Sequence, residues 1–102
     1  ELKNKDVYKK IDERDLDLII LDLPEPWNAL MNSYKALKYG KFLVCYLPTI
    51  NQVQDLLKSN KKFECIKTVE IIEREWQTDE GKVRPVSSII SHTGFMVFLR
   101  KI

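Results

Sequence analysis

Three polar side chains come at or near the ends of predicted strands, where α/β proteins place their ligand sites. Asp6 follows a strand-like start, Asp22 lies in a strand predicted over residues 16–23, and Tyr46 lies near the end of one predicted over 41–47. In open α/β sheets, ligands bind beyond the carboxyl ends of the strands. We therefore expect the three side chains at one edge of a sheet, where carboxylates can do acid–base or charge-stabilising chemistry.

Asp22 opens the string Asp22-Leu23-Pro24-Glu25-Pro26-Trp27. Two prolines two residues apart fix φ at both positions, which makes the turn stiff and holds the preceding carboxylate in place. Catalysis and cofactor binding both require such a fixed group. The alternative is that Asp22 only caps the following helix and that the prolines only end the strand. For Trp27 we expect core packing.

The elements that position these residues are predicted to be parallel βα units. The strand over 16–23 is nearly continuously apolar, which is typical of a strand covered on both faces. A helix follows, with its apolar stripe from Trp27 to Leu37 and with Gly40 as its C-terminal cap. After the strand over 41–47, Thr49 and Gln52 have the spacing of a capping box that opens a helix to about residue 60.

The remainder of the chain predicts an antiparallel pair at the edge of this sheet. Residues 63–75 form a long β-branched stretch and residues 94–102 a terminal strand, whereas residues 77–92 between them are polar and irregular. At the N-terminus, residues 1–3 look like the tail of a strand, 6–7 like a turn, and 7–14 like a short polar helix or loop. The predicted fold class is α/β.

Composition excludes several classes of site. The 102 residues include three glycines, which stand alone, so no glycine-rich phosphate or dinucleotide loop can form here. No apolar run reaches the ~20 residues of a membrane span, and no signal-peptide pattern is present. Cys45 and Cys65 are too few for a zinc knuckle, no metal cluster is visible, and Cys45 is expected in the core.

Charge is unevenly distributed although the net charge is only +2. Residues 35–67 carry seven lysines against two acids, whereas residues 70–82 carry five acids against two basic residues. Such asymmetry can steer a polyanion onto one face, and the alternative is that the lysines merely solvate helix faces. The lysines near 58–62 and the basic tail could touch RNA phosphates, without individual assignment.

Four blocks in order resemble the tRNA (adenine-N1)-methyltransferase family. They are the string 22–27, the run 44–49 (VCYLPT) with Gln52-Val53, Arg84-Pro85, and 92–95 (HTGF); residues 70–76 (EIIEREW) are similar too. Members of this family use S-adenosylmethionine to make 1-methyladenosine in the T-loop of tRNA. The resemblance runs over nearly all 102 residues and implies a cytoplasmic, homo-oligomeric (tetrameric) parent protein without a membrane segment.

The resemblance also implies a partial domain. The glycine-rich cofactor loop of the family, its ribose-binding acid and its N-terminal β-rich domain lie upstream of the matched region, and the chain begins with Glu rather than Met. We therefore expect residues 1–102 to be the C-terminal half of a Rossmann-like class I methyltransferase domain, inactive alone.

Site roles follow from the resemblance position by position. Asp6, with the Val7 backbone beside it, matches the acid that hydrogen-bonds the cofactor adenine, and Asp22 matches the active-site aspartate beside the methyl donor and the target base. Tyr46 matches a tyrosine of the target-base pocket, and His92 a residue near it. The alternatives are a turn residue for Asp6, a core aromatic for Tyr46 and a structural role for His92.

Two other functions stay open from the sequence. The chain could belong to a non-catalytic RNA-binding or assembly subunit of a methyltransferase complex, although such a subunit has no need for the Asp22 carboxylate. It could also belong to another S-adenosylmethionine-dependent methyltransferase, acting on a small molecule or on DNA.

Overall fold

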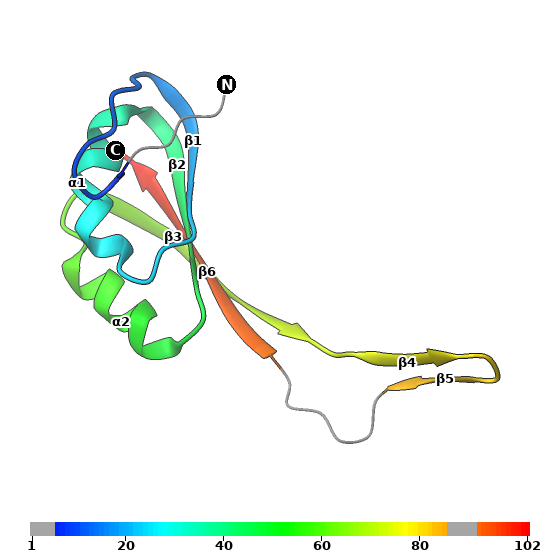
Figure 1. Cartoon of the computed structure of the whole chain (residues 1–102). Helices are drawn as coiled ribbons and strands as arrows, with labels where there is room; N and C mark the ends of the chain where they lie inside the picture. The colour runs from blue at the N-terminus through cyan, green and yellow to red at the C-terminus, as the bar shows by residue number, and fades with distance from the viewer. Residues whose placement is uncertain (1–5, 86–91) are drawn as a thin grey trace.

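Two helices lie on one side of a four-stranded mixed sheet, and a two-stranded hairpin extends from its lower end (Figure 1). The structure, a computed structural model, describes residues 6–85 and 92–102. The elements in chain order are β1 (Leu16–Leu21), the 3₁₀ turn η1 (Pro26–Ala29), α1 (Leu30–Ala36), β2 (Leu37–Leu47), α2 (Ile50–Ser59), β3 (Phe63–Glu73), β4 (Trp76–Asp79), β5 (Lys82–Pro85) and β6 (His92–Lys101).

The sheet has the strand order β1-β2-β6-β3. β1 and β2 are parallel, whereas β6 is inserted between β2 and β3 and is antiparallel to both. This confirms the predicted parallel βα units followed by an antiparallel pair at the sheet edge. β3 is the edge strand on this side of the sheet, and it pairs with β6 from Phe63↔Lys101 to Glu73↔His92.

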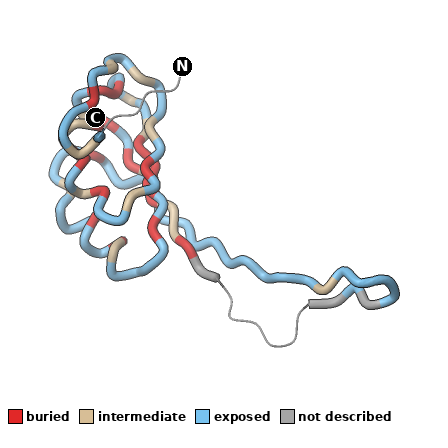
Figure 2. Tube along the Cα trace, viewed as in Figure 1, coloured by how far each residue is buried: buried red, intermediate tan, exposed pale blue. Residues whose placement is uncertain are grey.

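The core lies between the sheet and the helices. Alternate residues of the central strands, among them Leu43, Cys45, Val97 and Leu99, are fully buried against the inner sides of α1 and α2. Figure 2 shows this concentration of buried residues in the sheet and the inner helix faces. Trp27 packs against the same cluster, as expected. In the described residues, no helix is long and apolar enough to cross a membrane.

The second helix begins as its sequence predicts. The Thr49 hydroxyl accepts a hydrogen bond from the Gln52 backbone N–H (3.3 Å), and the Gln52 side-chain oxygen accepts one from that hydroxyl (2.8 Å). This pair of contacts satisfies an N–H group that the first turn of a helix leaves without a partner.

The predicted role of Gly40 is wrong. The helix ends at Ala36, and Gly40 lies inside β2 with φ of +82°, a backbone conformation that glycine adopts without strain. Here the register shifts: Leu16 pairs with Leu37, but Leu18 pairs with Phe42, so β2 makes an excursion beside β1. The Gly40 carbonyl at this excursion accepts a hydrogen bond from the Arg100 Nε–H (3.2 Å).

The region expected to be irregular contains a hairpin instead. β4 and β5 pair antiparallel from Trp76↔Pro85 to Asp79↔Lys82, with Gly81 at φ of +77° in the turn. The sequence signal was weak because the strands are short, polar and exposed where described (Figure 2). The predictions for residues 1–3, and for the part of 77–92 that falls at 86–91, lie outside the described residues.

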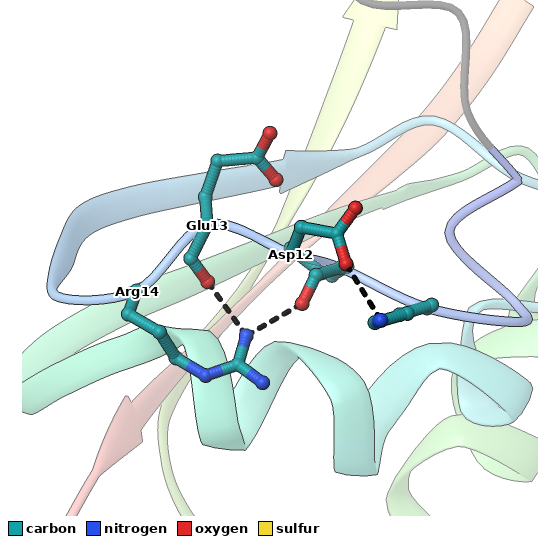
Figure 3. Close-up of polar contacts among 5 residues, drawn as sticks. Asp12, Glu13 and Arg14 are labelled. Carbon is teal, nitrogen blue, oxygen red and sulfur yellow. Dashed lines mark hydrogen bonds and ion pairs between the residues drawn. The ribbon is translucent and has the colours of Figure 1, made fainter.

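The segment before β1 is a turn and a loop rather than a helix. The Arg14 guanidinium donates hydrogen bonds back to the carbonyls of Ile11 and Glu13, and Lys10 pairs with Asp12 at 3.1 Å (Figure 3). Asp15 then has φ of +58°, a left-handed conformation that lets the chain reverse into β1. These contacts all lie within residues 10–14, so they shape the loop locally.

One face of the sheet is uncovered, contrary to the expectation that β1 is buried on both faces. Leu18 and Ile20 of β1 are 52% and 63% exposed. Their neighbours on this face complete a shallow apolar hollow of about 540 Å³, which we call the open face; its apolar residues are Leu18, Ile20, Phe42, Val44, Ile66, Met96 and Phe98. No described helix lies over this side of the sheet in Figure 1.

The two cysteines are predicted to differ in reactivity. Burial raises the pKa of the Cys45 thiol to about 12, whereas Cys65 is exposed; both thiols are free. The thiolate is the reacting form. At pH 8 we therefore expect iodoacetamide to alkylate Cys65 and spare Cys45, as read by peptide mass spectrometry.

The control is the unfolded chain in denaturant, in which both cysteines should react. Burial of the neutral Cys45 thiol contributes fully to stability at pH values below the ordinary thiol pKa. Above that pKa the unfolded chain loses the Cys45 proton while the folded chain keeps it, so this contribution is lost as pH rises. Equal alkylation of the two cysteines in the folded chain would contradict the buried position of Cys45.

Candidate active site

Asp22 and Tyr46 are brought together by the pairing of β1 with β2. The last pair of this parallel ladder is Leu21↔Cys45, and the next residues along the two strands are Asp22 and Tyr46. Neighbouring strands lie about 5 Å apart. Leu21 and Cys45 are buried toward the helices, so the alternation of side chains directs Asp22 and Tyr46 toward the open face, where both are exposed. The sequence prediction that they share the carboxyl edge is confirmed.

The turn after Asp22 is held by contacts from two other segments. The Pro24 carbonyl accepts a hydrogen bond from the Gln52 side-chain N–H (2.9 Å), and the Glu25 backbone N–H donates to the Tyr8 hydroxyl (3.3 Å). Pro26 is fully buried. The turn is therefore anchored at three successive positions in addition to the stiffness of its prolines.

Asp22 does not cap the following helix. The residue before η1 is Glu25, and no side chain caps that turn. In the part of the chain that the structure describes, no hydrogen bond or ion pair engages the Asp22 carboxylate, so it is free to face a ligand.

Tyr46 lies over Gly94 of the neighbouring strand. β2 and β6 pair at Tyr46↔Met96, two residues from Gly94. A Cβ atom added to Gly94 would lie 2.5 Å from the Tyr46 hydroxyl oxygen and 2.7 Å from a ring carbon, far inside contact distance. Tyr46 is 37% exposed, which excludes the alternative that it is a core aromatic. The glycine thus makes room for a ring that lines the open face beside Asp22.

His92 begins β6 and pairs through its backbone with Glu73 at the end of β3. Because β6 is antiparallel to β2, its first residues lie at the same sheet edge as Tyr46. The role of the His92 side chain stays a prediction, as does that of every site residue taken from the resemblance.

Asp6 begins a turn, which is the alternative role that the sequence analysis gave for this residue. One carboxylate oxygen accepts a hydrogen bond from the Tyr8 N–H (3.0 Å), and the Asp6 carbonyl accepts from the N–H groups of Lys9 and Lys10. The Asn32 side chain donates to the Val7 and Tyr8 carbonyls (3.0 and 3.2 Å), which docks this turn on α1. The second oxygen of Asp6 has no partner among the described residues, so binding of a ligand is compatible with the turn.

Sequence reasoning missed the groups that hold these residues in place. Tyr8 and Asn32 gave no signal, because their partners lie 17 and more residues away in the chain. Gln52 was recognised as a capping residue but not as the anchor of Pro24. In the described residues, no three His, Cys, Asp or Glu side chains gather as a metal-binding group.

The parallel βα units followed by the antiparallel edge pair match part of a Rossmann-like class I methyltransferase fold. A solved S-adenosylmethionine-dependent O-methyltransferase from Thermotoga maritima is similar to this chain, with 33% identity and a TM-score of 0.74; the match covers 96% of this chain and 38% of that one. The solved tRNA (m1A58) methyltransferase TrmI from Aquifex aeolicus gives 33% identity and a TM-score of 0.74, over 92% of this chain and 39% of that one.

Sequence comparison narrows the class to one family. The chain is 48% identical over 99 residues to the tRNA (adenine(57)-N(1)/adenine(58)-N(1))-methyltransferase TrmI of Methanocaldococcus jannaschii, and 37% identical over 94 residues to TrmI of Thermus thermophilus. The matches cover 93% and 90% of this chain. The family model described as "tRNA methyltransferase complex GCD14 subunit" matches residues 1–84, and the chain belongs to this family. It spans 35% and 37% of the length of these two relatives.

The contact between Tyr46 and Gly94 gives a prediction about stability. Gly94→Ala should destabilise the fold by about 1–3 kcal/mol, because the new methyl group overlaps the tyrosine ring and forces it aside. Thermal or urea unfolding followed by circular dichroism measures the change.

The matched test is a double-mutant cycle with Tyr46→Ala. Without the Tyr46 ring, Gly94→Ala should lower the free energy of unfolding much less, since the effects of substitutions at two sites in contact are not additive. Strictly additive costs would show that the ring and the glycine do not meet.

Proposed function

We propose that this chain is the C-terminal part of the catalytic domain of an S-adenosylmethionine-dependent tRNA (adenine-N1)-methyltransferase. The observation that carries the proposal is the place of Asp22 and Tyr46, which directly follow the last β1–β2 pair at the carboxyl edge of the sheet and are both exposed. The named activities of the relatives and the family of the chain agree with it.

Asp22 has the chemistry that methylation of adenine N1 requires. The N1 atom is a weak nucleophile, and the product ring carries a positive charge. A fixed carboxylate beside the N6 amino group stabilises that developing charge and can accept a proton from the amino group. The anchored turn keeps the carboxylate in place before the substrate arrives, so no reorganisation is needed during the reaction.

Tyr46 and His92 are proposed to border the target base. RNA-binding sites commonly hold an unstacked base against an aromatic ring. The Tyr46 ring lies over the Gly94 backbone, in space that a Cβ atom at that position would occupy, and it is exposed at the same sheet edge as Asp22. His92 enters the proposal through its place at the same sheet edge.

The residues present fit one side of a cofactor site. S-adenosylmethionine, when bound, supplies an electrophilic methyl group. Asp6 keeps one carboxylate oxygen for the amino group of the cofactor adenine, with the Val7 backbone beside it, and Asp22 borders the methyl donor. The fit rests on the exposed carboxylates of Asp6 and Asp22, which no described residue neutralises.

The open face supports the proposal that this is a partial domain. Monomeric proteins rarely expose a large contiguous apolar patch, and the residues of the open face come from all four strands of the sheet. We propose that an upstream part of the parent protein packs here and completes the cofactor pocket, since the chain spans only 35% of the length of the Methanocaldococcus jannaschii relative.

The proposed parent protein is cytoplasmic, acts on tRNA and is homo-oligomeric, as a tetramer. Support for an assembly comes from relatives in Dictyostelium discoideum and Kluyveromyces lactis, which are named as catalytic subunits of tRNA (adenine(58)-N(1))-methyltransferase.

In the parent protein, Asp22→Asn should lower kcat for tRNA methylation by roughly 10²–10³-fold, because the amide keeps the shape but removes the charge that stabilises the product cation. The measurement is transfer of labelled methyl groups to unmodified tRNA, with the methylated atom mapped by nuclease digestion and mass spectrometry.

Asp17→Asn is the matched control on the same strand. Asp17 is an exposed carboxylate that pairs with Lys38 at 3.2 Å, and an exposed pair of this kind contributes at most about 1 kcal/mol. It should leave kcat unchanged. Unchanged turnover in a well-folded Asp22→Asn protein would contradict the catalytic role of Asp22.

The 102 residues alone should show no methyl transfer to tRNA, since the open face is uncovered and the glycine-rich side of the cofactor site is not part of them. The same assay on the parent protein is the positive control. Turnover by the isolated chain at the rate of the parent protein would refute the partial-domain proposal.

A further inference from the structure

A second hollow lies on the helix-covered side of the molecule, away from the open face. It has a volume of about 180 Å³ and lies between η1 and α1 on one wall and the turn from α2 to β3 on the other. We call it the helix groove; its lining residues are Trp27, Leu30, Met31, Tyr34, Ser59, Asn60, Lys61, Lys62 and Phe63. Small-molecule sites usually measure roughly 300–1,000 Å³, so this groove suits a single planar ring.

The charge of the groove is positive. Lys61 and Lys62 line it and are exposed, and no acidic residue lines it. In the described part of the chain, neither lysine forms an ion pair. Their positive charge is therefore available to an anionic ligand.

Tyr34 organises the lysine end of the groove. Its ring packs edge-on against Phe63 at 5.4 Å, its hydroxyl donates to the Ile102 carbonyl (2.9 Å), and the Lys62 ammonium lies 5.1 Å from the ring centre. Desolvation and, as a smaller effect, the neighbouring Tyr39 raise the pKa of Tyr34. The cation–π contact holds the ammonium group at the mouth of the groove.

The other wall is apolar and comes from η1 and α1, which follow Asp22 in the chain. Trp27 closes the string that begins at Asp22, and Met31, which is 48% exposed, lies one helical turn further on. An aromatic and a thioether side chain facing two lysines are suited to a ligand that carries a flat ring and a phosphate.

We propose that the helix groove binds one unpaired nucleotide of the RNA substrate, with its base against Trp27 and Met31 and its phosphate on Lys61 and Lys62. The inference rests on the proposed function and adds a second RNA contact to it.

The test uses the parent protein and unmodified tRNA. Lys61→Ala and Lys62→Ala should each raise KM for tRNA with kcat unchanged. Each should also reduce the slope of the logarithm of the tRNA binding constant against the logarithm of the salt concentration by about 0.7–0.9, the effect of one lost phosphate contact. Lys61→Arg and Lys62→Arg should restore both quantities. Bound tRNA should also protect Lys61 and Lys62 from acetylation, as measured by mass spectrometry.

Met31→Ser separates the base contact from the phosphate contact. It should raise KM but leave the salt slope unchanged, because no charge is lost. The matched controls are Lys41→Ala and Leu57→Ser, which change an exposed lysine and an exposed apolar residue outside the groove and should alter neither quantity.

The outcomes distinguish the two proposals. If the parent protein methylates tRNA but Lys61 and Lys62 react equally with and without bound tRNA, or the lysine variants keep the full salt slope, the groove proposal is wrong and the proposed function stands. If the parent protein neither binds nor methylates tRNA, both proposals are wrong.

Discussion

The parallel register of β1 on β2 is the constraint on which the site depends. Side chains alternate along a strand, so a slip of one residue would exchange the two faces of β1. Leu21 and Cys45 fix the register because both must be buried against the helices. Their burial leaves Asp22 and Tyr46 on the opposite face at the end of the ladder. The apolar core thus determines which way the polar site points.

The turn after Asp22 shows how local and distant contacts combine. Its prolines restrict the backbone locally, and this is evident from the sequence. That restriction alone does not fix the position of the turn relative to the sheet. Gln52 does that: it takes part in the N-terminal cap of α2 and also donates to the Pro24 carbonyl. Because α2 follows directly from β2, the same helix that packs on the core also positions the turn that follows β1.

Much of the fold could be predicted because its signals are local. The strands and the Thr49 cap each follow from patterns within a dozen residues, and the antiparallel pair followed from two long strands separated by a polar stretch. The role of Gly40 and the β4–β5 hairpin could not, since a glycine after a helical stripe predicts a cap and short polar strands carry no apolar alternation. The overlap of Tyr46 with Gly94 joins two strands far apart in the chain, so it emerges only once their register is known.

The open face and the candidate site lie next to each other on the same side of the sheet. Leu18 and Ile20 lie on one side of β1, and Asp22 is the next residue of this row, directly after the strand. Phe42, Val44 and Tyr46 form the corresponding row along β2. A segment that covers the apolar residues therefore also borders the carboxylate and the ring at the end of the same rows. Burial of a large apolar side chain contributes about 1.5–3 kcal/mol, so the hydrophobic effect alone favours such a covering. Under the proposed function, such a covering would also enclose the site, lower the local dielectric and strengthen the interaction of Asp22 with a developing positive charge.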